Sequence, residues 1–168
     1  DTMGFDRCGV SDRMGWRMSN LARIIDYLPQ MPMAEKILTL QAEMLKHPQI
    51  EPVTKHTFHG GMYCREVTQP AGVLIVGKVH KLEHFFFVLS GDVAVTIDEE
   101  IKLITKPTLL CSKPGAKRAI YAQTDTVFMT IHRLDSTNVE DAENEMLEDA
   151  PDSPFTTGNI LRTNIVEI

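Results

Sequence analysis

Cysteine is scarce in this chain of 168 residues. Cys8, Cys64 and Cys111 are odd in number, far apart and without a CxxC spacing, which excludes a disulfide framework or a zinc ribbon. Cys64 and Cys111 each lie in a strand-like run, where we expect a small buried thiol rather than a reactive one. We therefore expect a reducing compartment, either the cytoplasm or a particle assembled there.

Long apolar runs are also missing. No run approaches the ~20 residues that a membrane-spanning helix needs, and the N-terminus has no signal-peptide pattern. We therefore expect no membrane partner and no secretion by a signal peptide. Because the chain begins at Asp1 rather than at a methionine, we expect that a few residues are missing or have been processed away.

Positive charge is in deficit, since 17 Lys and Arg face 23 Asp and Glu and the formal net charge is −6. General nucleic-acid binding is not expected, because its affinity comes largely from neutralising phosphates. The signatures GxSxG, HExxH, the Walker loop and the Rossmann fingerprint are absent as well, and Ser90 has no recognisable base beside it. These absences favour a protein that is not an enzyme, without deciding the question.

The residues that are present divide the chain into three regions. Residues 1–52 are expected to form a helical N-terminal arm, in which LARIIDYL follows Asn20 and MAEKILTLQAEMLKH repeats apolar residues at helical spacing up to Pro48. Residues 53–134 contain short β-rich runs every 8–12 residues, separated by Gly, Pro and Asp turns. No helix long enough to connect parallel strands interrupts these runs, so they predict an antiparallel sandwich or barrel.

The third region, residues 135–168, is an acidic extension. Asn138 is expected to cap a short helix, VEDAENEMLED, whose first-turn acids suit the positive end of the helix dipole. PDSP ends this helix, and GNILRTNIVEI is expected to add one late strand. Two interpretations of the acidic run stay open: a solvated face, or an arm that binds a basic neighbour.

Two motifs in the middle region resemble those of the cupin superfamily of small jelly-roll barrels. GKVHKLEHFFFVLSGDVAV is similar to the first cupin motif, in which a glycine is followed by His-x-His, then Glu, then Gly. On this pattern Gly91 matches the closing glycine and His80 the second histidine, while Lys78 stands at the first histidine and His84 at the glutamate. SKPGAKRAIYA is similar to the second motif, with Arg118 about where its histidine is expected.

The resemblance implies a mainly β, cupin-like antiparallel jelly-roll barrel that carries the helical N-terminal arm and the acidic C-terminal extension. It also implies the position of a metal site, which in the family holds Fe, Mn, Ni or Zn on three histidines and a carboxylate. Lys78 and Arg118 replace two of these ligands. Repulsion between unit charges 4–6 Å apart costs about 3–4 kcal/mol at an effective dielectric of ~20, so the standard four-ligand site is not expected.

A reduced site stays open, in which His80 and His84 are completed by His132 first, or by His56 or His59. Such a site would hold a divalent transition metal, namely Zn, Fe, Mn or Ni. The alternative is that His80 and His84 are hydrogen-bonded interior histidines at the barrel rim and that His132 is a satisfied core histidine. His56 and His59 precede a Gly-Gly turn and are expected on the surface.

Lys78 and Arg118 also have two interpretations. With the histidines, and with Tyr63 on the first strand, they would form a ligand site that binds a carboxylate or phosphate through charge-assisted hydrogen bonds. Alternatively, both side chains extend along an apolar wall and leave their charges in water. The strand pattern alone does not fix the face that Tyr63 takes.

The middle region further resembles small cupin-like proteins encoded by tailed phages. That resemblance implies a non-enzymatic assembly or accessory protein, located in the host cytoplasm or the virion, that forms a homo-oligomer and contacts phage structural proteins. The alternative is a metal-dependent small-molecule enzyme, an isomerase or oxygenase of the cupin type, or a ligand sensor. Its site would comprise His80, His84 and His132.

Overall fold

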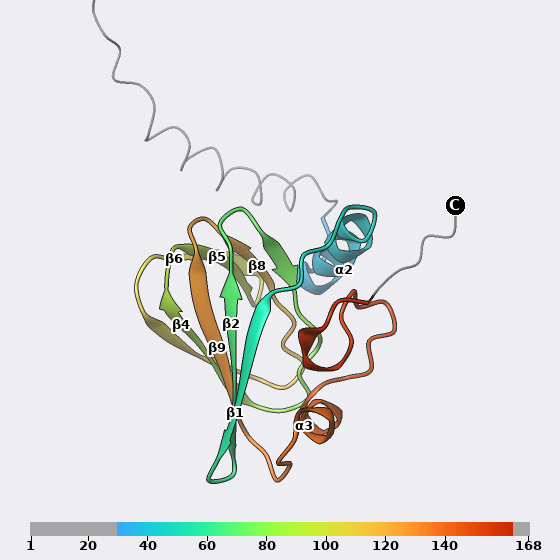
Figure 1. The fold of residues 1–168 in the computed structure, drawn as a ribbon. Helices are drawn as coiled ribbons and strands as arrows, with labels where there is room; N and C mark the ends of the chain where they lie inside the picture. Colours follow the sequence, from blue (N-terminus) through green and yellow to red (C-terminus); the bar gives the residue numbers. More distant parts are fainter. Residues whose placement is uncertain (1–29, 163–168) are drawn as a thin grey trace, which may run out of the picture.

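The structure is a computed structural model that describes residues 30–162 (Figure 1). The described elements are α2 (Met33–Met44), β1 (Val53–His59), β2 (Met62–Gln69), β3 (Leu74–Val76), β4 (His84–Ser90), β5 (Val93–Ile97), β6 (Glu100–Ile104), β7 (Thr108–Ser112), β8 (Ala119–Ala122), β9 (Thr126–Arg133), α3 (Val139–Met146) and the 3-10 helix η1 (Thr157–Asn159). The helix predicted after Asn20 lies outside the described residues.

The nine described strands form two sheets that face each other (Figure 1). One has the order β1-β2-β9-β4-β7 and the other the order β3-β8-β5-β6. All strand pairs in them are antiparallel. The predicted fold class, a mainly β antiparallel jelly roll with a helix before it, is confirmed. The predicted division into residues 1–52, 53–134 and 135–168 stays a prediction.

The turn after β4 shows why one motif residue has to be glycine. Gly91 has φ +87°, a left-handed conformation that a residue with a Cβ adopts only with strain. A Cβ at this position would also clash with the carbonyl oxygen of Asp125 and with Thr126. The closing glycine of the predicted motif is therefore required by the backbone.

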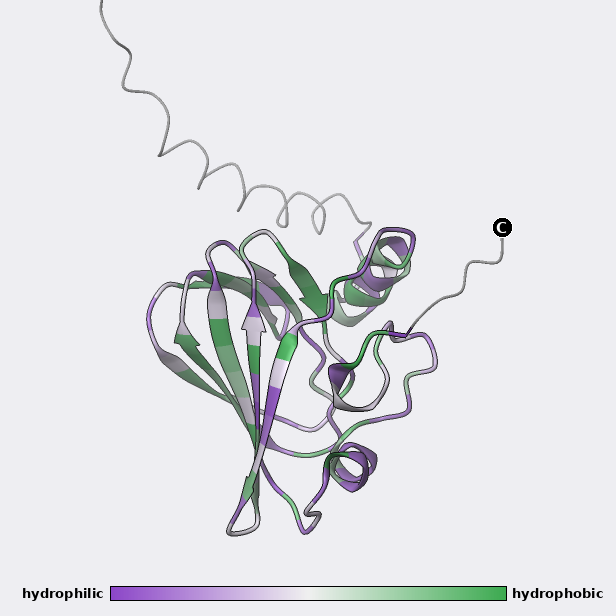
Figure 2. Cartoon of the chain, in the orientation of Figure 1, coloured by the Kyte–Doolittle hydropathy of each residue, from purple (hydrophilic) through white to green (hydrophobic). Residues whose placement is uncertain are grey.

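Alternation along the strands directs apolar side chains into the space between the sheets. Figure 2 shows hydrophobic residues, in green, along the strands. The largest buried apolar cluster comprises Val67, Phe86, Val88, Val93, Val95, Ile104, Ile120 and Phe128. The core thus lies between the sheets, as the period of the sequence indicates.

The helix α2 covers part of the smaller sheet. Met33, Ile37 and Leu40 recur at helical spacing and are buried in one cluster with Val76 of β3 and Ala119 of β8. The helix ends at Met44, a little before the predicted end. None of the helices in residues 30–162 is long and apolar enough to cross a membrane.

The C-terminal extension packs against the barrel. Asn138 caps α3 as predicted, because its Oδ1 accepts from the backbone N–H of Asp141 at 2.9 Å. One face of α3 is buried, however: Ala142 and Met146 are 0% exposed and pack in one cluster with Tyr63. Glu140 and Asp141 on the other face are exposed, as the interpretation of a solvated acidic face predicts, whereas Glu143 is buried.

Two smaller predictions also need correction. The late strand expected from Gly158 is not present in residues 158–162, where η1 is followed by a single bridge between Phe155 and Leu161, and the rest of the segment lies outside the described residues. Cys111 is exposed rather than buried, because β7 is an edge strand and alternation points this side chain out of the barrel. Cys64, in β2, is half-buried.

Candidate functional site

The register of the five-stranded sheet arranges its inner face in layers that run from polar to apolar. In β9 the inward residues are His132, Thr130 and Phe128, and the strand pairing brings residues of β2, β4 and β7 alongside them. The layers are Tyr63, His132, His84 and Ser112; then Arg65, Thr130, Phe86 and Leu110; then Val67, Phe128 and Val88. Two histidines thus share the layer at one end of the barrel.

The third histidine comes from an irregular segment. β3 ends at Val76, so Lys78 and His80 do not lie in a continuing strand, contrary to the prediction. Instead the backbone N–H of His80 donates to the carbonyl oxygen of Ala116 at 3.0 Å, and the N–H of Gly115 donates to that of His80 at 2.8 Å. These bonds hold His80 at the mouth of the barrel, facing the histidine layer.

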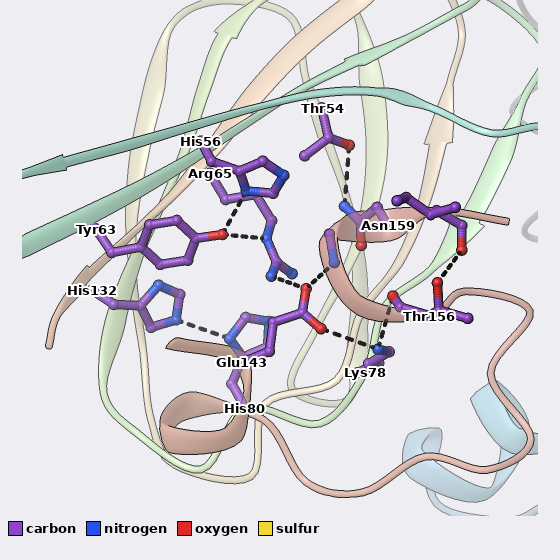
Figure 3. Close-up of polar contacts among 12 residues, drawn as sticks. Thr54, His56, Tyr63, Arg65, Lys78, His80, His132, Glu143, Thr156 and Asn159 are labelled. Atoms are coloured by element: carbon purple, nitrogen blue, oxygen red, sulfur yellow. Dashed lines mark hydrogen bonds and ion pairs between the residues drawn. The ribbon is translucent and has the colours of Figure 1, made fainter. Parts of the chain in front are cut away.

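His80, His84 and His132 form a compact cluster. One ring nitrogen from each lies within 4.8 Å of the others. The ring centroids are 4.2 to 5.1 Å apart, and Nδ1 of His80 lies 2.9 Å from Nε2 of His132 (Figure 3). Nδ1 of His84 donates to the carbonyl oxygen of Leu82 at 3.0 Å, which leaves the lone pair on Nε2.

The cluster is held in its neutral form. Burial lowers the pKa of each histidine, well below the usual value for His80 and to about 3 for His132. The positive charges of Arg65 and Arg118 act in the same direction, Arg65 on His80 and His132, and Arg118 on His80 and His84. The site therefore presents three neutral imidazoles near pH 7.

Neutral imidazole is the form that binds transition metals, so the donor set fits such an ion. Two nitrogens on one tetrahedral zinc lie roughly 3.3 Å apart, as Zn–N distances of about 2.0–2.1 Å require. To match this spacing, the 2.9 Å between His80 and His132 must open slightly, and any nitrogen pair near the 4.8 Å limit of the cluster must close. His84 is oriented by a backbone carbonyl, as metal-bound histidines usually are. The positive charges of Arg65 and Arg118, in contrast, disfavour binding of a cation at this site.

Of the three residues considered as a third ligand, the structure brings only His132 to the pair. His56 Nδ1 lies 2.7 Å from the hydroxyl of Tyr63, and His59 is exposed at the end of β1. Burial also lowers the pKa of His56. His56 and His59 are therefore not part of the cluster.

A buried ion cluster lies beside the histidines and was not predicted. Glu143 of α3 is 7% exposed and accepts from Arg65 Nη2 at 2.5 Å. Its carboxylate also pairs with Lys78 Nζ at 3.4 Å and accepts from the backbone N–H of Gly158 at 2.8 Å (Figure 3). The sequence does contain a signal for the burial of Glu143, because this residue shares the helical face of Ala142 and Met146.

The predicted ligand residues have different surroundings. Lys78 is engaged by Glu143. Tyr63 is 0% exposed, and its hydroxyl accepts from Arg65 Nε at 3.1 Å. Arg118 lies over the ring of Phe86, 5.4 Å from the centroid, and its Nη2 donates to Ser112 Oγ at 2.8 Å. Ligand binding by these residues stays a prediction.

A cavity of about 80 Å³ lies between the sheets at this end. On the same measure one water needs only ~10–15 Å³, so there is room for a small molecule. Polar lining residues are Arg65, Lys78, His80, His84, Arg118, Thr130, Ser153 and Asn159, and the apolar wall includes Val67, Ile75, Phe86, Ile120 and Phe128. Leu147, Ser153 and Phe155 of the C-terminal extension close one side.

No family model matches the chain, and no curated protein matches it. The solved structures to which it is similar include cupin superfamily proteins. A cupin superfamily protein of Desulfitobacterium hafniense is 11% identical over 56% of this chain and 87% of its own, with a TM-score of 0.44. The cupin domain of a transcriptional regulator from Enterobacter cloacae is 16% identical over 49% and 95%, with a TM-score of 0.43.

A salicylate 1,2-dioxygenase from Pseudaminobacter salicylatoxidans is 14% identical over 67% of this chain and 35% of its own, with a TM-score of 0.48. The predicted likeness to phage proteins receives no support from these structures and stays a prediction. At such identities the activity and ligands of those proteins do not carry over to this chain.

Proposed function

We propose that this protein binds a divalent transition metal on His80, His84 and His132 and uses the adjoining cavity for a small molecule. The observation that carries the proposal is the convergence of three neutral imidazoles, with ligand nitrogens within 4.8 Å of one another, beside that cavity. An all-imidazole set suits Zn, Fe or Ni better than Mn, which favours carboxylate and water.

A bound metal of this kind would supply Lewis-acid chemistry. The chain's own residues have other roles. The C-terminal extension excludes water from one side of the cavity, and the Glu143 carboxylate fixes Arg65 beside it. The site thus suits a metal-dependent small-molecule enzyme, an isomerase or oxygenase, or a ligand sensor.

Metal content of the purified chain, followed by titration of the metal-free protein with Zn²⁺, Fe²⁺, Ni²⁺ and Mn²⁺, tests this proposal. We expect near-stoichiometric binding that is lost in His84→Ala. His59→Ala is the matched control, because this histidine is exposed and outside the cluster. If none of the four ions binds, or if His84→Ala binds as tightly as the native chain, the metal site is wrong.

Assembly is a second candidate function, and one observation favours it. The outer face of β4 and the edge strand β7 exposes Phe85 and Leu109, which are 42% and 54% exposed. An open strand edge beside apolar side chains suits pairing with a second copy of the chain. Solution mass tests a homo-oligomer, and cosedimentation with particles tests the predicted virion role. A strictly monomeric protein absent from particles would contradict both.

A further inference from the structure

Two residues that line the cavity each carry a buried polar atom with no hydrogen-bond partner. Thr130 is 8% exposed and its Oγ1 is unpaired, and Nε of Arg118 is also buried and unpaired. Both residues line the cavity. Leaving a buried donor unpaired costs about 1–3 kcal/mol, and more for a charged group, so native proteins seldom do so without a bound partner.

The charge around the cavity indicates the sign of that partner. Arg118 stays protonated, and within residues 30–162 it forms no ion pair with a carboxylate. Only the field of the more distant Asp98 opposes the effect of burial, which lowers the pKa of Arg118. Arg65 and Lys78, by contrast, share Glu143. Because the described lining residues include no acid, the cavity favours an anion.

The opposite end of the cavity limits the kind of anion. Its walls are apolar, with Val67 and Phe128 from one sheet facing Ile75 and Ile120 from the other. A fully hydrated anion such as phosphate would lose its water there without gaining polar partners. A ligand with one charged end and an apolar body satisfies both ends at once.

We propose that the cavity binds a small monocarboxylate with an apolar body, whose carboxylate pairs with the guanidinium of Arg118 beside Thr130 while its body packs against Phe86 and Phe128. This inference deepens the proposed function, since it names the class of small molecule that the cavity takes. It uses no histidine, however, so the anion site does not need the metal.

Calorimetric titration of the full chain with benzoate and isobutyrate, in metal-free and zinc-treated forms, tests the inference. Either carboxylate should bind, whereas the neutral analogues benzamide and isobutyramide and inorganic phosphate should bind at least about tenfold more weakly, as loss of charge-assisted bonds predicts. Arg118→Gln should weaken carboxylate binding by about tenfold or more and Thr130→Val by a few-fold. Arg133→Gln is the control, because this arginine is exposed.

Carboxylates and amides that bind equally, binding unchanged in Arg118→Gln with its fold verified by circular dichroism, or binding of neither carboxylate would overturn the inference. The two proposals fail separately. Carboxylate binding to a chain that takes up no metal leaves the anion site standing and removes the metal site. Metal uptake without carboxylate binding does the reverse.

Discussion

Arg65 in β2 and Arg118 just before β8 line one cavity from different sheets, yet they stand in opposite electrostatic situations. Arg65 is 7% exposed and is matched by Glu143, whereas Arg118 has a hydroxyl, an aromatic face and an unpaired Nε. The first arrangement is complete within the chain. Arg118 lacks a hydrogen-bond partner for Nε. From this difference we infer that Arg65 stabilises the fold and that Arg118 binds a ligand.

Replacing Glu143 should destabilise the protein, because this carboxylate pairs with Arg65. Glu143→Gln leaves Arg65 and Lys78 buried without a carboxylate, and loss of one partner of a buried ion pair costs about 3–5 kcal/mol. Urea unfolding followed by circular dichroism measures the change. Glu140→Gln, exposed one turn earlier in the same helix, is the matched control and should change stability little. Equal effects of the two variants would show that the ion cluster is not structural.

Acid should destabilise the metal-free protein through the three clustered histidines, each of which lies in the field of Arg65, of Arg118 or of both. Their pKa values are lowered in the fold, so below about pH 6.5 the unfolded chain binds protons that the folded chain does not. Stability is therefore full above pH 6.5 and falls as pH drops, for His132 down to about pH 3, by up to ~1.4 kcal/mol per pH unit for each histidine.

Urea unfolding in chelator between pH 7.5 and 5 measures this slope. His84→Asn should flatten it, because one titrating group is removed from the cluster while a side chain of similar polarity remains. A stability that is constant over this range would contradict the neutral state of the three histidines.

Local features of the site could be predicted from the sequence, and its long-range contacts could not. Gly91 and the Asn138 cap follow from backbone chemistry within a few residues, and the β period sets the inner faces. His132 was the first choice for a third ligand, but its placement beside His84 depends on the register of β9 against β4. Strand register across more than 40 residues is not encoded in either strand alone.

The charged residues show more clearly which contacts of the site could not be predicted from the sequence. Lys78 lines the cavity with His80 and His84, as one of its two interpretations expected, but GVLIVGKVH does not form the single strand on which that interpretation rested. β3 stops at Val76, and Lys78 meets the carboxylate of Glu143 from a helix some 60 residues later in the chain. Glu143 lies in an acidic run whose members differ only in the face of α3 that they occupy. Which acid is buried depends on how the helix docks, and docking is a tertiary property.

The smallest expected change in the free energy of unfolding is that of replacing Arg118. Arg118→Gln loses the bond to Ser112 and the contact with Phe86, but it also removes a buried charge that has no acid partner. These terms oppose each other, so in the absence of any carboxylate the free energy of unfolding should change by less than about 1 kcal/mol. Arg65→Gln should cost about 3 kcal/mol in the same assay, because it leaves Lys78 as the one cation paired with the buried Glu143 among the described residues. A loss in Arg118→Gln as large as that in Arg65→Gln would mean that both arginines are structural. A small loss, joined to weaker benzoate binding, would mean that Arg118 contributes mainly to ligand binding rather than to stability.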